Sequence, residues 1–298
     1  MTLIIVILLG VSIALPLLFA WQTWSLEKPS RASWLISVGE KLAFVVLIGL
    51  VGRWDIAGIW TRMVLAALFV TAVIASWRRH AARPWRIERR PTVKTLASVA
   101  PLAIYFALFV YVIIGLLPNA APHDLRFPLR GDWFVIAQGG DNRLIDHHNS
   151  HPAQRHAADI TAVGPLGFRS PGILPPDPAR YRVYGADVVS PCDGEVRELV
   201  DGLSDLPPPT RDPENPAGNH IVIACDGIEV TLAHLSPGSP TVDVGDMVQE
   251  GQSIARVGNS GNSTEPHLHI HAADPATDTA VAITFDGRTP FRNRLYLR

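Results

Sequence analysis

Histidines and one aspartate gather in three short stretches of the second half of the chain. They are PHLHIH at 266–271, TLAHL at 231–235 and QRHAADI at 154–160. Alternate residues of a β-strand face the same side, so His267 and His269 share a face. A catalytic zinc site has three protein ligands and one position open to water. Two such imidazoles, together with an aspartate and a histidine from a neighbouring strand, could supply its side chains.

Short strands separated by turns rich in Gly, Pro, Asn and Asp are predicted to position these residues. The candidate strands are 132–140, 157–163, 194–200, 218–235, 253–262 and 267–273. The triplet CDG at 225–227 predicts a tight hairpin, because Asp-Gly accepts positive φ angles. Residues 203–217 are too rich in Pro and Asp for a strand and are expected to form a surface loop, which often borders a binding groove. Residues 119–298 are therefore predicted to form a mainly antiparallel β domain.

Residues 1–118 differ in character, because they hold long apolar runs. The whole chain has 298 residues, 48% of them hydrophobic, and a net charge of -1. The gathering of apolar runs in its first part predicts a membrane region followed by a globular domain. Four runs are long enough to cross a hydrocarbon core of about 30 Å as helices, at about 2–21, 34–52, 58–77 and 97–117. A cleaved signal peptide is a weaker interpretation of the first run, which lacks a basic n-region.

Basic residues in the connections predict the orientation of this membrane region. Seven Arg/Lys residues lie in 78–94 and two in 22–33, whereas 52–57 holds only Arg53, offset by Asp55. Under the positive-inside rule the first and third connections are cytoplasmic, so the C-terminal domain is expected to lie outside the cytoplasm.

An ionisable pair, Glu40 and Lys41, lies within the second apolar run. Charged residues inside a membrane span are functional candidates by default, so the helices could be the functional unit with the outer domain as a sensor. The plainer interpretation is that the pair packs against neighbouring helices, or that the true span is shifted.

Composition excludes two other classes of protein. The turns of 242–258 are shared with biotin and lipoyl carrier domains, but these need a modifiable lysine and no lysine follows Lys94. Basic residues of the globular part are scattered among acids, so no nucleic-acid partner is predicted. Cys192 and Cys225 are too few for a disulfide framework, and either one bridge or two free thiols is possible.

Four runs in the second half together resemble a known family: SPCDGEV, GNHIVI, LAHL and VDVGDMVQEGQSIARVGNSGNSTEPHLHIH. They are similar to lysostaphin-type (LytM-like) zinc metallopeptidases, which cut peptide bonds in peptidoglycan, and the resemblance covers about 155–271. It implies the fold of that family and a Zn²⁺ cofactor. It also implies that His269 and Asp159 are metal ligands, and that His267 and His234 assist the attacking water without binding the metal.

The sequence departs from the family at the first metal ligand. Arg155 stands four residues before Asp159, where the family has a histidine, and arginine cannot bind zinc. Possible substitutes are His147, His148, His151 and His156. His156 is out of phase with Asp159 on an extended strand, so we expect a loop histidine, His148 first, to supply the ligand.

Two further histidines receive plainer interpretations. His271 shares the face of His267 and His269, but it follows the end of the family motif and is expected to be an outer-shell or exposed residue. His220 is expected to be an ordinary strand residue.

These observations together predict a multi-pass zinc metalloendopeptidase in the cytoplasmic membrane of a bacterium, with its β domain periplasmic or otherwise extracytoplasmic. Its expected partners are the lipid bilayer and peptidoglycan or another extracytoplasmic peptide. The alternative, prompted by Arg155, is an inactive domain of the same fold that acts as a cell-wall binding or regulatory module.

Overall fold

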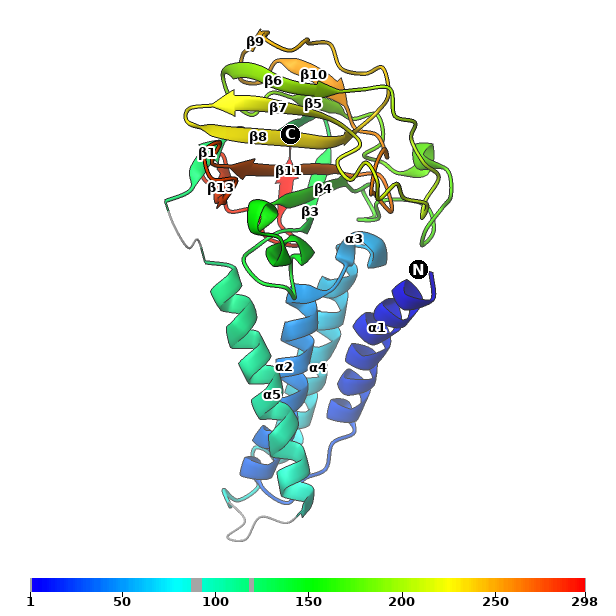
Figure 1. Cartoon of the computed structure of the whole chain (residues 1–298). Helices are drawn as coiled ribbons and strands as arrows, with labels where there is room; N and C mark the ends of the chain where they lie inside the picture. The colour runs from blue at the N-terminus through cyan, green and yellow to red at the C-terminus, as the bar shows by residue number, and fades with distance from the viewer. Residues whose placement is uncertain (1, 87–92, 118–120, 298) are drawn as a thin grey trace. The chain divides into compact units, whose positions relative to one another are not determined.

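The structure is a computed structural model that describes residues 2–86, 93–117 and 121–297 (Figure 1). It forms two compact units, Thr2–Ile114 and Gly115–Arg298. The predicted domain boundary, between 118 and 119, lies outside the described residues.

Helices make up the first unit. They are α1 Thr2–Trp24, α2 Arg31–Val51, α3 Trp54–Ala57, α4 Thr61–His80 and α5 Val93–Gly115, of which only the last residue belongs to the second unit. Three stretches are long and apolar enough to cross a membrane: Leu3–Trp24, Arg31–Val51 and Thr61–His80. A shorter apolar stretch, Val99–Gly115, lies in α5, so the fourth predicted span stays a prediction.

The apolar helices pack through small and aromatic side chains, with polar contacts near one end. Phe69 of α4 is buried against Ala20 of α1. At the end of α4, His80 accepts the backbone N–H of Lys28 at 3.0 Å through Nε2 and donates through Nδ1 to the Ser76 carbonyl at 2.7 Å. These bonds tie the α1–α2 connection to the end of α4.

The intramembrane pair predicted from the sequence lies on α2. Lys41 donates from Nζ to the carbonyl of Ser37 at 3.1 Å and lies 5.9 Å from the centroid of the Phe19 ring. Both contacts are local packing, and a functional role for Glu40 and Lys41 stays a prediction.

Strands dominate the second unit, and this confirms the predicted fold class. They are β1 His123–Leu125, β2 Leu129–Arg130, β3 Trp133–Gln138, β4 Ala158–Ala162, β5 Asp187–Val189, β6 Gly194–Val200, β7 Asn219–Cys225, β8 Ile228–Leu235, β9 Met247–Val248, β10 Ser253–Arg256, β11 Leu268–Ala273, β12 Ala280–Val281, β13 Ile283–Phe285 and β14 Leu295–Leu297. In the part of the chain described, the main sheet runs β14-β3-β4-β11-β8-β7-β6-β9 with β12 beside β11, all antiparallel (Figure 1).

The β7–β8 hairpin follows the alternation in the sequence. Ile221, Ile223 and Cys225 are buried, while the residues between them are half-buried. The turn has φ 37° at Asp226 and 83° at Gly227, as the Asp-Gly pair predicts. Cys225 forms a disulfide with Cys192, just before β6, across a Cα–Cα distance of 6.0 Å.

Candidate metal centre

Two central strands of the main sheet bring the aspartate and one histidine face to face. Antiparallel pairing of β4 and β11 sets Asp159 opposite His269. Both are 5% exposed, and Nδ1 of His269 lies 3.0 Å from Oδ1 of Asp159. Pairing between strands far apart in the sequence therefore creates this part of the site.

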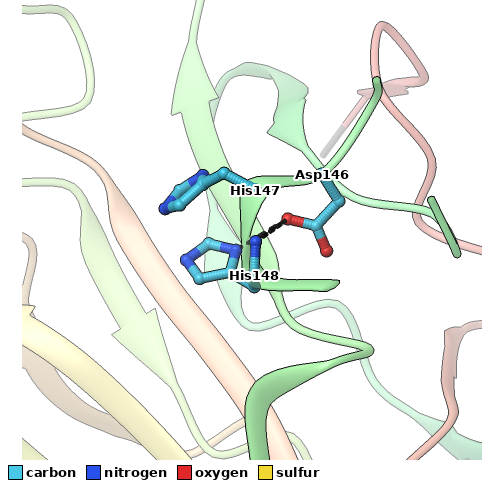
Figure 2. Close-up of side chains that lie close together, drawn as sticks. All are labelled: Asp146, His147 and His148. Atoms are coloured by element: carbon cyan, nitrogen blue, oxygen red, sulfur yellow. Dashed lines mark hydrogen bonds and ion pairs between the residues drawn. The ribbon is translucent and has the colours of Figure 1, made fainter. Parts of the chain in front are cut away.

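A short 3-10 helix, η1 His147–Ser150, brings a second histidine to the same carboxylate. Asp146 caps η1, because its Oδ1 accepts the backbone N–H of His148 at 3.0 Å. The same oxygen accepts a hydrogen bond from Nδ1 of His148 at 2.8 Å (Figure 2). The other ring nitrogen, Nε2, lies 3.5 Å from Oδ1 of Asp159.

The three side chains have the spacing that a metal ion requires. Potential ligand atoms of His148, Asp159 and His269 all lie within 4.8 Å of one another, and all three residues are buried. Bonds of about 2.0–2.1 Å in a tetrahedral zinc site separate two ligand atoms by about 3.3 Å. Oδ1 of Asp159 lies 3.0 Å from Nδ1 of His269 and 3.5 Å from Nε2 of His148, one distance just below that value and one just above it.

The other histidines of this region lie differently. His147 is exposed, with its ring 3.8 Å from that of His148, and forms a second possible metal group with Asp146 and His148 (Figure 2). His151 is exposed. His156 lies 3.8 Å from Asp141, in agreement with its predicted outward phase.

Arg155 also points to Asp141, with Nε 2.9 Å from Oδ1 of that carboxylate. Its side chain is half exposed to solvent, at 53%. The guanidinium is thus paired with Asp141 within the loop.

A β-bulge aims the third histidine, His234 of β8. The register of β7 and β8 shifts beside it, and its φ of 63° lies in the left-handed region that few residues other than glycine adopt. Its Nδ1–H donates to the carbonyl of Ser260 at 2.9 Å, which leaves Nε2 as an acceptor.

His267, just before β11, has the same tautomer by an equivalent contact. Its Nδ1–H donates to the carbonyl of Glu265 at 2.8 Å, and its Nε2 lies 3.5 Å from Oδ1 of Asp159. The rings of His234 and His267 have centroids 4.8 Å apart. Neither residue belongs to the group of three possible ligands.

Electrostatics in this cluster favour a positive charge beside Asp159. Burial raises the pKa of that carboxyl, but the charges of His148 and His267 and the hydrogen bonds it receives outweigh burial and hold the pKa well below its usual range. Burial lowers the pKa of His148, but Asp159 and Asp146 outweigh it and raise that pKa. In contrast, burial and repulsion by His267 and His269 hold the pKa of His234 well below its usual value.

A buried ion pair supports the segment before His267. Arg169, 1% exposed, pairs with the carboxylate of Glu265, and its guanidinium carbon lies 5.3 Å from the centroid of the Tyr181 ring. Because the backbone carbonyl of Glu265 orients His267, this pair connects the 164–182 segment to the site.

The loop at 203–217 packs against the segment that precedes the histidine run. Oδ1 of Asp205 accepts the backbone N–H of Asn259 at 2.6 Å, and Asp212 donates its N–H to the Gly261 carbonyl at 2.9 Å. Gly261 has φ 77°, and a Cβ there would lie 2.4 Å from the backbone nitrogen of Gly218. This close approach explains the second glycine in GNSGN. The strand predicted at 253–262 is shorter in the structure and ends at Arg256.

Comparison with known proteins identifies a family for part of the second unit. Residues 181–281 match the sequence profile of Peptidase family M23. The C-terminal unit contains a family M23 domain. The match includes His234, His267 and His269, whereas His148 and Asp159 precede it.

The curated relatives match only part of the chain. DD-carboxypeptidase/endopeptidase Mpg of Neisseria meningitidis serogroup B (strain ATCC 13091 / M2091) is 32% identical over 124 residues, which are 40% of this chain and 26% of that protein. The protein of the same name from Neisseria gonorrhoeae matches equally. The chain thus spans about a quarter of the length of these curated relatives.

Solved structures with similarity to the M23 domain include two peptidases. The catalytic domain of the antimicrobial peptidase lysostaphin from Staphylococcus simulans has 25% identity, covers 37% of this chain and 84% of that chain, and gives a TM-score of 0.25. A zinc containing peptidase from Vibrio cholerae has 22% identity, with coverage of 54% and 37% and a TM-score of 0.28.

Sequence reasoning missed one residue beside the M23 domain's histidines. It gave Asp146 no role, although the order Asp-x-His is a signal for a carboxylate that binds the imidazole two residues later. His271 lies on the predicted face, and its Nδ1 lies 3.0 Å from Nε2 of His269.

Proposed function

We propose that the C-terminal domain is a zinc metalloendopeptidase that hydrolyses peptide bonds in peptidoglycan peptides or in another extracytoplasmic peptide. The observation that carries the proposal is the buried group of His148, Asp159 and His269, with two further imidazoles beside it in an M23 domain. The relatives named DD-carboxypeptidase/endopeptidase support a peptidase that acts on the cell wall.

His148, Asp159 and His269 would hold the zinc ion, through Nε2, a carboxylate oxygen and Nδ1 respectively. The raised pKa of His148 supports this assignment, because the surroundings that favour a proton on the ring also favour a bound cation. When bound, zinc supplies a Lewis acid that polarises the scissile carbonyl and lowers the pKa of a water molecule to about 7.

His267 and His234 would move and hold protons. Each directs its Nδ1–H to a backbone carbonyl, so in the neutral ring the Nε2 lone pair of each faces the site as an acceptor. One of these Nε2 atoms accepts the proton of the attacking water, and the resulting imidazolium returns it to the leaving amine. The low pKa of His234 makes it the neutral partner, which orients the water.

The helices would anchor this peptidase in the cytoplasmic membrane of a bacterium, with the M23 domain outside. The backbone N–H of Arg31 donates to the Pro84 carbonyl at 3.2 Å, so the first and third connections, both predicted to be cytoplasmic, lie together. Arg89 and Arg90 of the third connection lie outside the described residues. The Cys192–Cys225 disulfide supports an oxidising location for the domain.

Cysteine labelling tests this orientation. In intact cells with a permeabilised outer membrane, an impermeant maleimide should label Ala121→Cys but reach Ala82→Cys only after lysis. The two native cysteines form a disulfide and do not compete. Labelling of Ala82→Cys in intact cells would exclude the proposed orientation.

Hydrolysis by the purified full chain in detergent tests the proposed activity. Incubation with isolated peptidoglycan should release peptide fragments cut at internal bonds, identified by mass spectrometry. Chelation should stop the release and Zn²⁺ should restore it. His267→Ala should abolish release while the protein still binds zinc.

The alternative, a binding or regulatory module, predicts another result. A folded, zinc-free chain that sediments with peptidoglycan and releases no fragments would favour it over the peptidase. Arg155 motivated this alternative, because the family's first ligand is missing there. The position of His148 beside Asp159 and the pairing of Arg155 with Asp141 support the peptidase instead.

A further inference from the structure

Both histidines of the proposed ligand set have their second ring nitrogen engaged by another side chain. His148 faces Asp159 with Nε2 and Asp146 with Nδ1. His269 faces Asp159 with Nδ1 and His271 with Nε2. A metal ligand needs a lone pair on one nitrogen, so the other must carry the proton, and a fixed acceptor selects that tautomer.

Capping η1 does not account for all the contacts of Asp146. It is fully buried at the N-terminal cap of η1, and its Oδ1 accepts both the backbone N–H and the ring N–H of His148. Its Oδ2 is buried without a hydrogen-bond partner in the described structure. A buried carboxylate is costly unless its oxygens are satisfied, so one whose bonds go to a single histidine points to a role through that histidine.

His271 stands on the opposite side of the proposed ligand set. It is half-buried on β11, and its Nδ1 lies 3.0 Å from Nε2 of His269. If Nε2–H of His269 donates, Nδ1 of His269 keeps its lone pair toward Asp159. The alternation of β11 makes the contact possible, because positions 269 and 271 share a face.

We propose that Asp146 and His271 are positioning residues for the metal site. Asp146 fixes the ring plane and tautomer of His148, and His271 does the same for His269. The inference rests on the proposed zinc site and adds a reason why a histidine from a loop can replace the ligand missing at position 155. A loop side chain has rotamer freedom, and the Asp146 carboxylate removes it before the metal binds.

Two pairs of variants test whether the hydrogen-bond acceptor of each side chain matters, and not only its size. Asp146→Ala and His271→Val remove the acceptor, whereas Asp146→Asn and His271→Asn keep an oxygen able to accept at the same place. The matched controls are Asp141→Asn, whose carboxylate binds Arg155 in the same loop, and His220→Val, a histidine of the same sheet that bonds to Gly218 and Glu198.

Zinc affinity of the full chain in detergent is the deciding measurement, by competition with a chromogenic chelator. The absorption spectrum of the Co²⁺-loaded protein gives a second readout, and circular dichroism confirms folding. Acceptor removal should weaken zinc binding about 10–100-fold and alter the Co²⁺ spectrum, whereas the Asn variants should lose less and the controls should match the unaltered chain.

Each outcome decides the proposal. Equal zinc affinity in the unaltered chain, Asp146→Ala and His271→Val overturns the positioning roles but leaves the zinc site intact. An Asn variant that binds as poorly as its acceptor-free counterpart also contradicts the inference. A folded, unaltered chain that binds no zinc overturns both this inference and the proposed function.

Discussion

The Nε2 atom of His148 lies 3.5 Å from Oδ1 of Asp159. The two residues belong to different elements, a 3-10 helix and strand β4, and the chain between them includes Arg155. An imidazole from this loop thus lies beside the carboxylate that the family motif pairs with a histidine at position 155. The proposed metal site depends on this relationship.

Removal of Arg155 should leave the site intact. Its guanidinium is half exposed, and Asp141 keeps a hydrogen bond from Asn149 when the arginine is removed, so the change should cost about 0–1 kcal/mol. Arg155→Ala should therefore keep its zinc content, its hydrolytic rate and nearly all its unfolding free energy. Loss of zinc from this variant would show that the side chain supports the metal loop.

The left-handed backbone at His234 predicts different effects of two substitutions. Asn adopts a positive φ readily and valine does not, so His234→Val should be about 1–2 kcal/mol less stable than His234→Asn in chemical unfolding. Both should lower the rate of hydrolysis about 10²–10⁴-fold, because both lack the imidazole. Equal stability of the two would mean that the bulge relaxes.

His156 gives a test of pH dependence away from the proposed ligands. Burial and repulsion by Arg155 lower its pKa, although Asp141 partly offsets them. Because the unfolded state then binds the proton more tightly, this residue removes stability as pH falls through the ordinary value of 6.5. His156→Gln should lose less unfolding free energy than the unaltered chain between pH 7.5 and about 5.5. An identical loss would contradict the assignment.

The ion pair of Arg169 and Glu265 should matter for stability. Removing one member of a buried pair leaves the other charge uncompensated and costs about 3–5 kcal/mol. Arg169→Met should reach this range in urea unfolding, and the double variant with Glu265→Gln should cost less than the sum of the single changes. A cost below about 0.5 kcal/mol would show that solvent reaches the pair.

Strand periodicity was enough to predict much of this architecture. Alternation placed His269 and His271 on one face, and the Asp-Gly turn predicted the β7–β8 hairpin. Both are local properties of a chain whose strands have one buried face. The length and apolarity of α1, α2 and α4 were equally readable.

Contacts between distant segments could not be read in the same way. The bulge at His234 arises where its N–H bonds to Ala217 at the end of the 203–217 loop, and strand periodicity does not register such a bond. The Arg155 side chain pairs with Asp141, and the His148 ring is held by its hydrogen bond to Asp146. Neither contact follows from strand periodicity. The ligand roles of His148, Asp159 and His269 stay predictions that a metal measurement must test.

The central claim is that His148 completes a zinc site with Asp159 and His269. The zinc content of the folded full chain, measured by inductively coupled plasma mass spectrometry, tests it most directly. We predict about one zinc per unaltered chain, the same in the exposed control His151→Ala, and loss of zinc together with hydrolysis in His148→Ala. Zinc retained by His148→Ala, or absent from the folded unaltered chain, would contradict the account.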